Sequence, residues 1–226
     1  MQYCTAILLA AGSGTRFDPN KTKQRHMLLG KSVLRRSAEA LCASEYVDAL
    51  VAVVREDECE IARRELSFLS KPYTVVIGGQ TRQASAAIGF RNIPEETTEV
   101  LIHDAARCLI RTEGVDRVAL AVRAHGAASA VSAVHDTVKQ LDGEGRIAST
   151  LDRSRLCLAA TPQGFSVPIY REALACPASV TDDNMLVEHL GMRVYPVYVA
   201  ENPKITTPED MHYAEFLLGK RGERDE

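Results

Sequence analysis

The 226-residue sequence has no excess of positive charge, no paired cysteine motif and no long apolar run. Its formal net charge is −3, so no general basic field is present to hold a nucleic acid by its backbone. No apolar stretch is long enough to span a membrane, and no apolar signal core precedes the first strand-like run. The six cysteines include no CxxC pair, give no sign of a zinc knuckle or redox motif, and fit a reducing compartment. We therefore expect a cytoplasmic protein that binds neither nucleic acid nor membranes, and whose anion sites are local.

What the sequence does contain is an alternation of short apolar runs and stretches of helical periodicity. Strands are expected at 3–9, 48–54, 73–77 and 99–103, and helices at 31–43, 56–68, 81–91 and 113–124. Later elements are expected near 156–161 (strand), 167–175 and 182–190 (helices), 193–199 (strand) and 207–218 (helix). The pattern predicts one α/β domain, 1–226, with a parallel sheet between two helical layers. Ligands in such sheets bind beyond the carboxyl ends of the strands, where the polar clusters described below should converge.

A β-hairpin is expected where this alternation breaks down. Residues 129–139 and 146–151 flank the turn Asp142-Gly143-Glu144-Gly145, which has the composition of a hairpin turn. A two-stranded hairpin that packs against nothing else is only marginally stable in water. We therefore expect an arm at about 131–155 that packs on something else, such as a second subunit.

The stretch LLAAGSGTRF at 8–17 places glycines directly after the first strand, where backbone can approach a phosphate. A dinucleotide fingerprint would need a third glycine where Phe17 stands, and a P-loop ending at 30–32 would need one at Arg25. What remains is a turn whose N–H groups can face an anion, with Arg16 and Lys23 as two added positive charges. Two positive side chains can balance part of the negative charge of a triphosphate while one of its phosphorus atoms undergoes substitution.

Two further polar clusters also follow strands. Residues 78–85 (GGQTRQAS) allow close backbone approach to a ligand, although a capped helix with a solvated arginine is the favoured interpretation of this cluster taken alone. Residues 103–107 (HDAAR) place Asp104 at a strand end, as a metal-bound carboxylate or as a helix cap. We expect His103 to be packed or hydrogen-bonded rather than a metal ligand.

The remaining clusters lie in the second half of the chain. Residues 135–139 (HDTVK), Arg153 and 161–163 (TPQ) suit either an anion site or a solvated arm. Residues 181–183 and 204–210 resemble N-capping turns. No Ser-His-Asp or Cys-His arrangement is evident. The clusters fit phosphoryl or nucleotidyl transfer, in which an already anionic phosphate attacks and catalysis is positioning and charge stabilisation.

The order of these motifs, from LLAAGSGTRF through IHDAAR, HDTVK, ATPQGF and TDDNMLVE to NPKITTPED, resembles the 2-C-methyl-D-erythritol 4-phosphate cytidylyltransferase family over about residues 5–218. The resemblance implies a Rossmann-like nucleotidyltransferase three-layer sandwich with a protruding β-hairpin arm that interlocks a homodimer. It also implies transfer of a cytidylyl group from CTP to methylerythritol phosphate, with release of pyrophosphate and with Mg²⁺ as the cofactor.

The resemblance further implies roles for single residues. Arg16 and Lys23 would be catalytic, and Asp104 would contact the metal. Nucleotide binding would fall to Ala10, Ala11, Gly12, Ser13, Gly14, Gly79, Gln80, Arg82, Ser85 and Ala106. The sugar-alcohol phosphate would be bound by Arg107, Thr137, Arg153, Thr161 and Lys204, with Thr137 and Arg153 reaching across from the partner subunit.

The sequence departs from the usual family pattern at several positions, and these keep two alternatives open. Thr22, Thr81, Cys108 and Pro203 replace residues common in the family, as does the segment 132–135. Because the altered positions 108 and 203 leave the acceptor undetermined, a related cytidylyltransferase that uses ribitol 5-phosphate or another polyol phosphate is the first alternative. A non-catalytic nucleotide-binding paralogue is the second, and it predicts loss of Arg16, Lys23 or Asp104, all of which are present.

Overall fold

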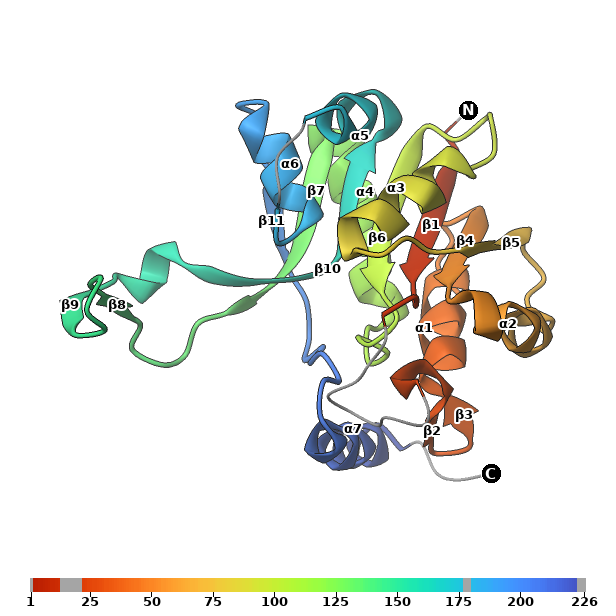
Figure 1. Cartoon of the computed structure of the whole chain (residues 1–226), viewed down its shortest axis with the longest axis horizontal. Coiled ribbons are helices and arrows are strands. Elements are labelled where there is room, and N and C mark those ends of the chain that lie inside the picture. The colour runs from red at the N-terminus through yellow and green to blue at the C-terminus, as the bar shows by residue number, and fades with distance from the viewer. Residues whose placement is uncertain (1, 13–21, 177–179, 223–226) are drawn as a thin grey trace.

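A seven-stranded sheet forms the centre of the protein, with strand order β11-β7-β10-β6-β1-β4-β5 (Figure 1). The computed structural model describes residues 2–12, 22–176 and 180–222, and at Lys23 the backbone only. The strands are β1 (Cys4–Leu9), β4 (Ala49–Val54), β5 (Tyr73–Ile77), β6 (Glu99–Asp104), β7 (Ala127–Ala133), β10 (Cys157–Ser166) and β11 (Tyr195–Tyr198). All run parallel except β10, which is antiparallel to both β6 and β7.

Helices cover both faces of this sheet because its central strands are apolar on both sides. In β1, Cys4, Ala6 and Leu8 join one core cluster, whereas Ile7 and Leu9 join the other. The first cluster includes residues of α1 (Val33–Cys42), α2 (Cys59–Leu66) and α4 (Thr112–His125). The second includes residues of α3 (Arg82–Arg91), α5 (Val167–Leu174) and α6 (Asp183–His189). The predicted three-layer α/β architecture is confirmed.

The parallel pairing expected for the first four strands is confirmed for β1, β4, β5 and β6, whereas β10 is antiparallel to both of its neighbours, and the predicted hairpin explains why. Strands β7 and β10 are neighbours in the main sheet, and the chain between them forms the arm. Strands joined as the two legs of a hairpin must be antiparallel. Residues 129–133, which the sequence assigns to the hairpin, lie in β7 and so belong to the central sheet.

The arm itself ends in a small two-stranded sheet of β8 (Lys139–Leu141) and β9 (Ile147–Thr150). Its turn lies where the sequence places it, with the amide of Gly145 donating to the Asp142 carbonyl at 3.1 Å. Figure 1 shows the arm extending away from the body of the protein. Leu141 and Ile147 are exposed on it, at 58% and 66% of their surface.

The last helix and a short hairpin close one end of the protein. Helix α7 (Pro208–Lys220) starts with a capping box formed by Thr207 and Asp210, as the sequence predicts. It shares a third core cluster with residues near β2 (Met27–Leu28) and β3 (Lys31–Ser32), a pair that sequence analysis did not anticipate. Three short 3-10 helices complete the elements: η1 (Lys23–Arg25), η2 (Glu56–Glu58) and η3 (Arg153–Arg155). Across the described ranges, no helix combines the length and apolarity needed to cross a membrane.

Candidate active site

A cleft of about 510 Å³ lies at the carboxyl ends of β1, β4, β5 and β6. Its size is typical of a small-molecule site. Each of these parallel strands sends the loop that follows it into the cleft wall, as the topology requires. The lining residues are Leu9, Ala11, Gly12, Gln24, Arg55, Gly79, Gln80, Thr81, Arg82, Ser85, Asp104, Ala106 and Lys204. The clusters that follow β1, β5 and β6 in the sequence thus meet in space.

Gly78 lets the loops after β1 and β5 approach each other closely, and Gly79 lets the loop after β5 pack against α3. A Cβ on Gly78 would lie 2.4 Å from Ala11 Cβ, and one on Gly79 would lie 2.6 Å from Ala84 Cβ. No side chain fits at either position without moving the backbone. Ser85, in the first turn of α3, accepts a hydrogen bond from the Gly79 amide at 3.1 Å. This hydroxyl therefore fixes the loop that forms one side of the cleft.

Asp104 is the one acid among the described residues that line the cleft, and two cations hold it. Its Oδ1 accepts from Arg82 Nε at 2.9 Å, and its Oδ2 accepts from Lys204 Nζ at 2.7 Å. Burial alone would raise the pKa of Asp104, but the positive charges of Arg82 and Lys204 outweigh burial and hold the pKa well below its ordinary value. Asp104 is therefore ionised throughout the physiological pH range.

Arg82 also contacts a second acid, Asp183 at the start of α6, whose Oδ2 accepts from the guanidinium at 2.6 Å. Asp183 is 1% exposed, and its Oδ1 accepts from the Tyr170 hydroxyl at 2.6 Å. Burial, together with the Asp183 carboxylate, raises the pKa of Tyr170 well above its ordinary value. Sequence analysis missed both residues, since it placed the segment 181–183 in a capping turn. That turn does exist, because Asp182 caps α6 through the Met185 amide.

The wall behind Asp104 is built by His103 and Thr161. The Thr161 hydroxyl accepts from the Asp104 amide at 3.1 Å and bonds His103 Nδ1 at 3.0 Å. His103 is fully buried, and burial lowers its pKa to about 4, so it is neutral at pH 7. His103 is thus hydrogen-bonded, as expected. Thr161, predicted to bind substrate, uses its hydroxyl within the protein.

Arg107, also predicted to bind substrate, lies beside the cleft without lining it. Its guanidinium donates to the carbonyls of Asn202 at 2.9 Å and Ala159 at 3.4 Å. Its buried Nε has no hydrogen-bond partner among the described atoms. Burial lowers the pKa of Arg107 from its ordinary value. A buried guanidinium with an unused donor is suited to receiving an anion.

Several predicted residues fall outside the region that the structure describes. These are Ser13, Gly14 and Arg16, together with the side chain of Lys23. Ala10 is buried at the end of β1 and donates to the Val53 carbonyl at 2.7 Å. Thr137 lies between β7 and β8 and Arg153 lies in η3, so both belong to the arm, and neither lines this cleft. Arg153 there donates to the His135 carbonyl.

Asp104 is the one carboxylate of the described cleft lining that could contribute to a divalent-cation site, and each of its oxygens already accepts from a cationic side chain. The described residues contain no group of three His, Cys, Asp or Glu side chains placed to hold a metal. Mg²⁺ is commonly bound by one or two carboxylates together with substrate phosphates and water. An ionised Asp104 at the cleft wall can supply such a carboxylate. Arg55, which also lines the cleft and pairs with Asp57 at 2.8 Å, was not anticipated from the sequence.

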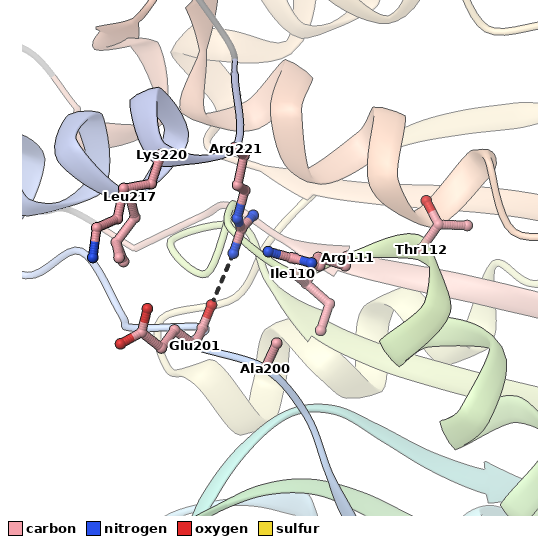
Figure 2. A pocket seen from close by; sticks show the side chains of 8 residues that line it. All are labelled: Ile110, Arg111, Thr112, Ala200, Glu201, Leu217, Lys220 and Arg221. Atoms are coloured by element: carbon pink, nitrogen blue, oxygen red, sulfur yellow. Dashed lines mark hydrogen bonds between the residues drawn. The ribbon is translucent and has the colours of Figure 1, made fainter.

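A larger cavity, of about 840 Å³, lies elsewhere and shares no lining residue with the cleft. Figure 2 shows its lining side chains, among them Arg111, Lys220 and Arg221. Arg221 donates to the carbonyls of Glu201 at 3.2 Å and Leu109 at 2.9 Å, so it ties the end of α7 to two loops. None of the predicted site residues that the structure describes lines this cavity, and we assign the site to the smaller cleft.

Comparison with known proteins gives one consistent result. A family model described as 2-C-methyl-D-erythritol 4-phosphate cytidylyltransferase matches residues 4–220. A protein with that name from Parasynechococcus marenigrum (strain WH8102) is 40% identical over 223 residues, covering 95% of this chain and 97% of its own. Another, from Thermosynechococcus vestitus, is 37% identical over 227 residues, covering 97% of each.

Solved structures agree. The 4-diphosphocytidyl-2C-methyl-D-erythritol synthase of Anaerococcus prevotii has a TM-score of 0.86 and 28% identity, covering 96% of both chains. The 2-C-methyl-D-erythritol 4-phosphate cytidylyltransferase of Thermus thermophilus has a TM-score of 0.75 and 28% identity, covering 96% of this chain and 98% of its own.

Proposed function

Because the chain belongs to the 2-C-methyl-D-erythritol 4-phosphate cytidylyltransferase family, we propose that it joins CTP to 2-C-methyl-D-erythritol 4-phosphate. The products are 4-diphosphocytidyl-2-C-methyl-D-erythritol and pyrophosphate. The observation that carries this proposal is the cleft at the strand ends, with glycine-bearing loops on one side and Asp104 between Arg82 and Lys204 on the other. Such a cleft supplies close backbone approach for phosphates and fixed charge for a reacting phosphorus.

In this reaction a phosphate oxygen of the acceptor attacks the α-phosphorus of CTP. The bond from that phosphorus to the oxygen that bridges to the β-phosphorus breaks, and its electron pair leaves with pyrophosphate. The attacking phosphate is already anionic, so no general base is needed. Residues 10–14 would bind the phosphates, and Arg16 and Lys23 would stabilise the charge that develops on them.

The base and the acceptor would take opposite parts of the site. Gly79, Gln80 and Ser85 form a rigid edge, where backbone groups could select a pyrimidine. Lys204 and Arg107 would bind the acceptor phosphate, and the Nε of Arg107, which is buried and has no partner among the described atoms, supports a role for this guanidinium. Mg²⁺, bound by Asp104 and the CTP phosphates, would neutralise phosphate charge.

We further propose a homodimer formed through the arm. Two observations support it: Leu141 and Ile147 are exposed on the arm, and Thr137 and Arg153 do not line the cleft of their own chain. Replacing Leu141 and Ile147 together by Asp should give a monomer in analytical ultracentrifugation, with a large loss of turnover. Glu144→Ala, at the same exposed tip, is the matched control. An active monomer, in the wild type or in the double variant, would refute the arm's role.

A cytoplasmic location, proposed from the six free cysteines, can be tested by cell fractionation.

The reaction is tested by following pyrophosphate release from CTP and Mg²⁺, with methylerythritol phosphate and ribitol 5-phosphate offered in parallel. We expect release with methylerythritol phosphate alone. Release with ribitol 5-phosphate instead would support CTP as the nucleotide substrate and refute methylerythritol phosphate as the acceptor. Measurable CTP binding without release from either acceptor would contradict the proposed activity.

A further inference from the structure

The Arg82 guanidinium is shared between two acids in very different surroundings. Its Nε donates to Asp104 at 2.9 Å, and a terminal nitrogen donates to Asp183 at 2.6 Å. Asp104 lines the cleft, whereas the Asp183 side chain is 2% exposed and is not part of the cleft wall. A ligand in the cleft can therefore touch Asp104 and Arg82 while Asp183 stays out of reach.

Asp183 is itself held rigidly on both sides. One of its oxygens accepts from the Tyr170 hydroxyl, and its amide donates to the Gln163 side chain at 3.0 Å. The Tyr170 ring is fully buried against Phe90 and Phe165, with ring centroids 5.1 Å apart in each pair. The second Asp183 oxygen is thereby directed at Arg82. A chain of contacts runs from the core beneath α5 to the cleft wall.

Arg82 has room to leave this position. Its side chain is 29% exposed, and the guanidinium fork can hold one carboxylate with two nitrogens. Without Asp183 it could turn toward solvent or place both nitrogens on Asp104. Either change would move the Asp104 carboxylate relative to Lys204.

We propose that Asp183 is a positioning residue for the cytidylyl transfer. It holds Arg82 in the one orientation that presents Asp104 between Arg82 and Lys204. This role rests on the proposed function, because Asp104 and Arg82 belong to the proposed catalytic cleft. The competing explanation is that Asp183 only attaches α6 to the sheet and serves stability alone.

The test compares Asp183→Asn with Glu99→Gln. Glu99 is 5% exposed, pairs with Arg123 at 3.1 Å and stands at the opposite end of β6 from Asp104. Both variants remove one buried carboxylate charge from an arginine. Because a displacement of about 1 Å at a reacting centre costs about 100-fold in rate, we expect kcat of Asp183→Asn to fall about 100-fold. We expect KM for CTP to change by less than about threefold in this variant, and Glu99→Gln to keep the wild-type kcat.

A second readout needs no substrate. The Nε–H resonance of Arg82 in nitrogen-edited NMR spectra is identified by its absence in Arg82→Lys. It should shift or broaden in Asp183→Asn and stay in place in Glu99→Gln. If Asp183→Asn fails to fold, Tyr170→Phe takes its place, because that variant loses one hydroxyl and keeps the ring packing. The same changes, smaller in size, are expected there.

Wild-type kcat in folded Asp183→Asn, an unmoved Arg82 resonance, or an equal loss of kcat in Glu99→Gln would each overturn the positioning role. A wild-type protein that turns over no acceptor would instead overturn the proposed function. In that case the Arg82 resonance still decides whether Asp183 orients Arg82.

Discussion

The variant Gly12→Ala tests whether an added methyl group affects the stability of the protein or only its affinity for a ligand in the cleft. Gly12 lines the cleft, and a Cβ placed on it would meet no described atom within 4 Å. Its φ lies outside the left-handed region, so alanine adopts the backbone without strain. A compatible Gly→Ala change stabilises a protein by about 0.4–1 kcal/mol, because it restricts the unfolded chain. The melting temperature of Gly12→Ala should therefore be unchanged or slightly raised.

CTP binding should respond in the opposite direction. If the phosphates lie against the backbone of the loop after β1, the methyl group occupies space that they need. Forcing one extra methyl into a packed contact costs about 1–3 kcal/mol, which corresponds to about a 5- to 150-fold loss of affinity. Isothermal titration of CTP in the presence of Mg²⁺ measures this loss directly.

The matched control is Gly143→Ala, in the turn of the arm, where a Cβ also meets nothing within 4 Å. It should likewise leave the melting temperature unchanged or slightly raised, and it should leave CTP affinity unchanged. Unchanged CTP affinity in Gly12→Ala would refute the placement of the phosphates against this loop. A drop of several degrees in its melting temperature would refute the premise that the space beside Gly12 is open.

Three further predictions follow from charges at the site. Asp104→Asn leaves Arg82 and Lys204 facing each other, so urea unfolding at pH 7 should show a loss of about 2–4 kcal/mol. Because the folded-state pKa of Asp104 is depressed, the wild type loses this advantage progressively as the pH falls from about 4 toward that lower pKa, and the difference between the two proteins should narrow over this range. His103, with a pKa of about 4, stays neutral when folded while the unfolded chain takes up a proton below about pH 6.5. The unfolding free energy should therefore fall by about 2 kcal/mol between pH 7 and 4.5, and a His103→Gln variant should lack this part of the slope. Lys23→Ala should abolish turnover and largely spare CTP binding, and an equal loss of both would contradict a transition-state role.

Much of the fold is readable from local patterns. The apolar runs that became β1, β4 and β6 are buried on both faces, and periodicity located the helices between them. Strand β10 could not be oriented in this way, because its direction depends on pairing with β7 across the whole arm. Orientation of a strand is a long-range property that local composition does not encode.

The residues of the site also differ in how far the sequence predicts them. Gly79, Arg82 and Asp104 follow strands or end them, so the sheet topology alone brings them together. Asp183 contacts Arg82 from about 100 positions further along the sequence, and Tyr170, which binds Asp183, lies about 90 positions from Arg82. Nothing in the local motifs around Asp183 or Tyr170 indicates that they are linked to Arg82. Buried acids that serve a distant arginine look like helix caps until the fold is known.

Strand β10 connects two regions that the sequence keeps separate. It begins at Cys157, where the arm ends, and it passes through Thr161, whose hydroxyl holds the Asp104 amide. The register of β10 against β7 shifts between Ala159 and Gln163, around that hydroxyl. The base of the arm and the threonine that holds the back of the cleft are therefore built by one continuous strand.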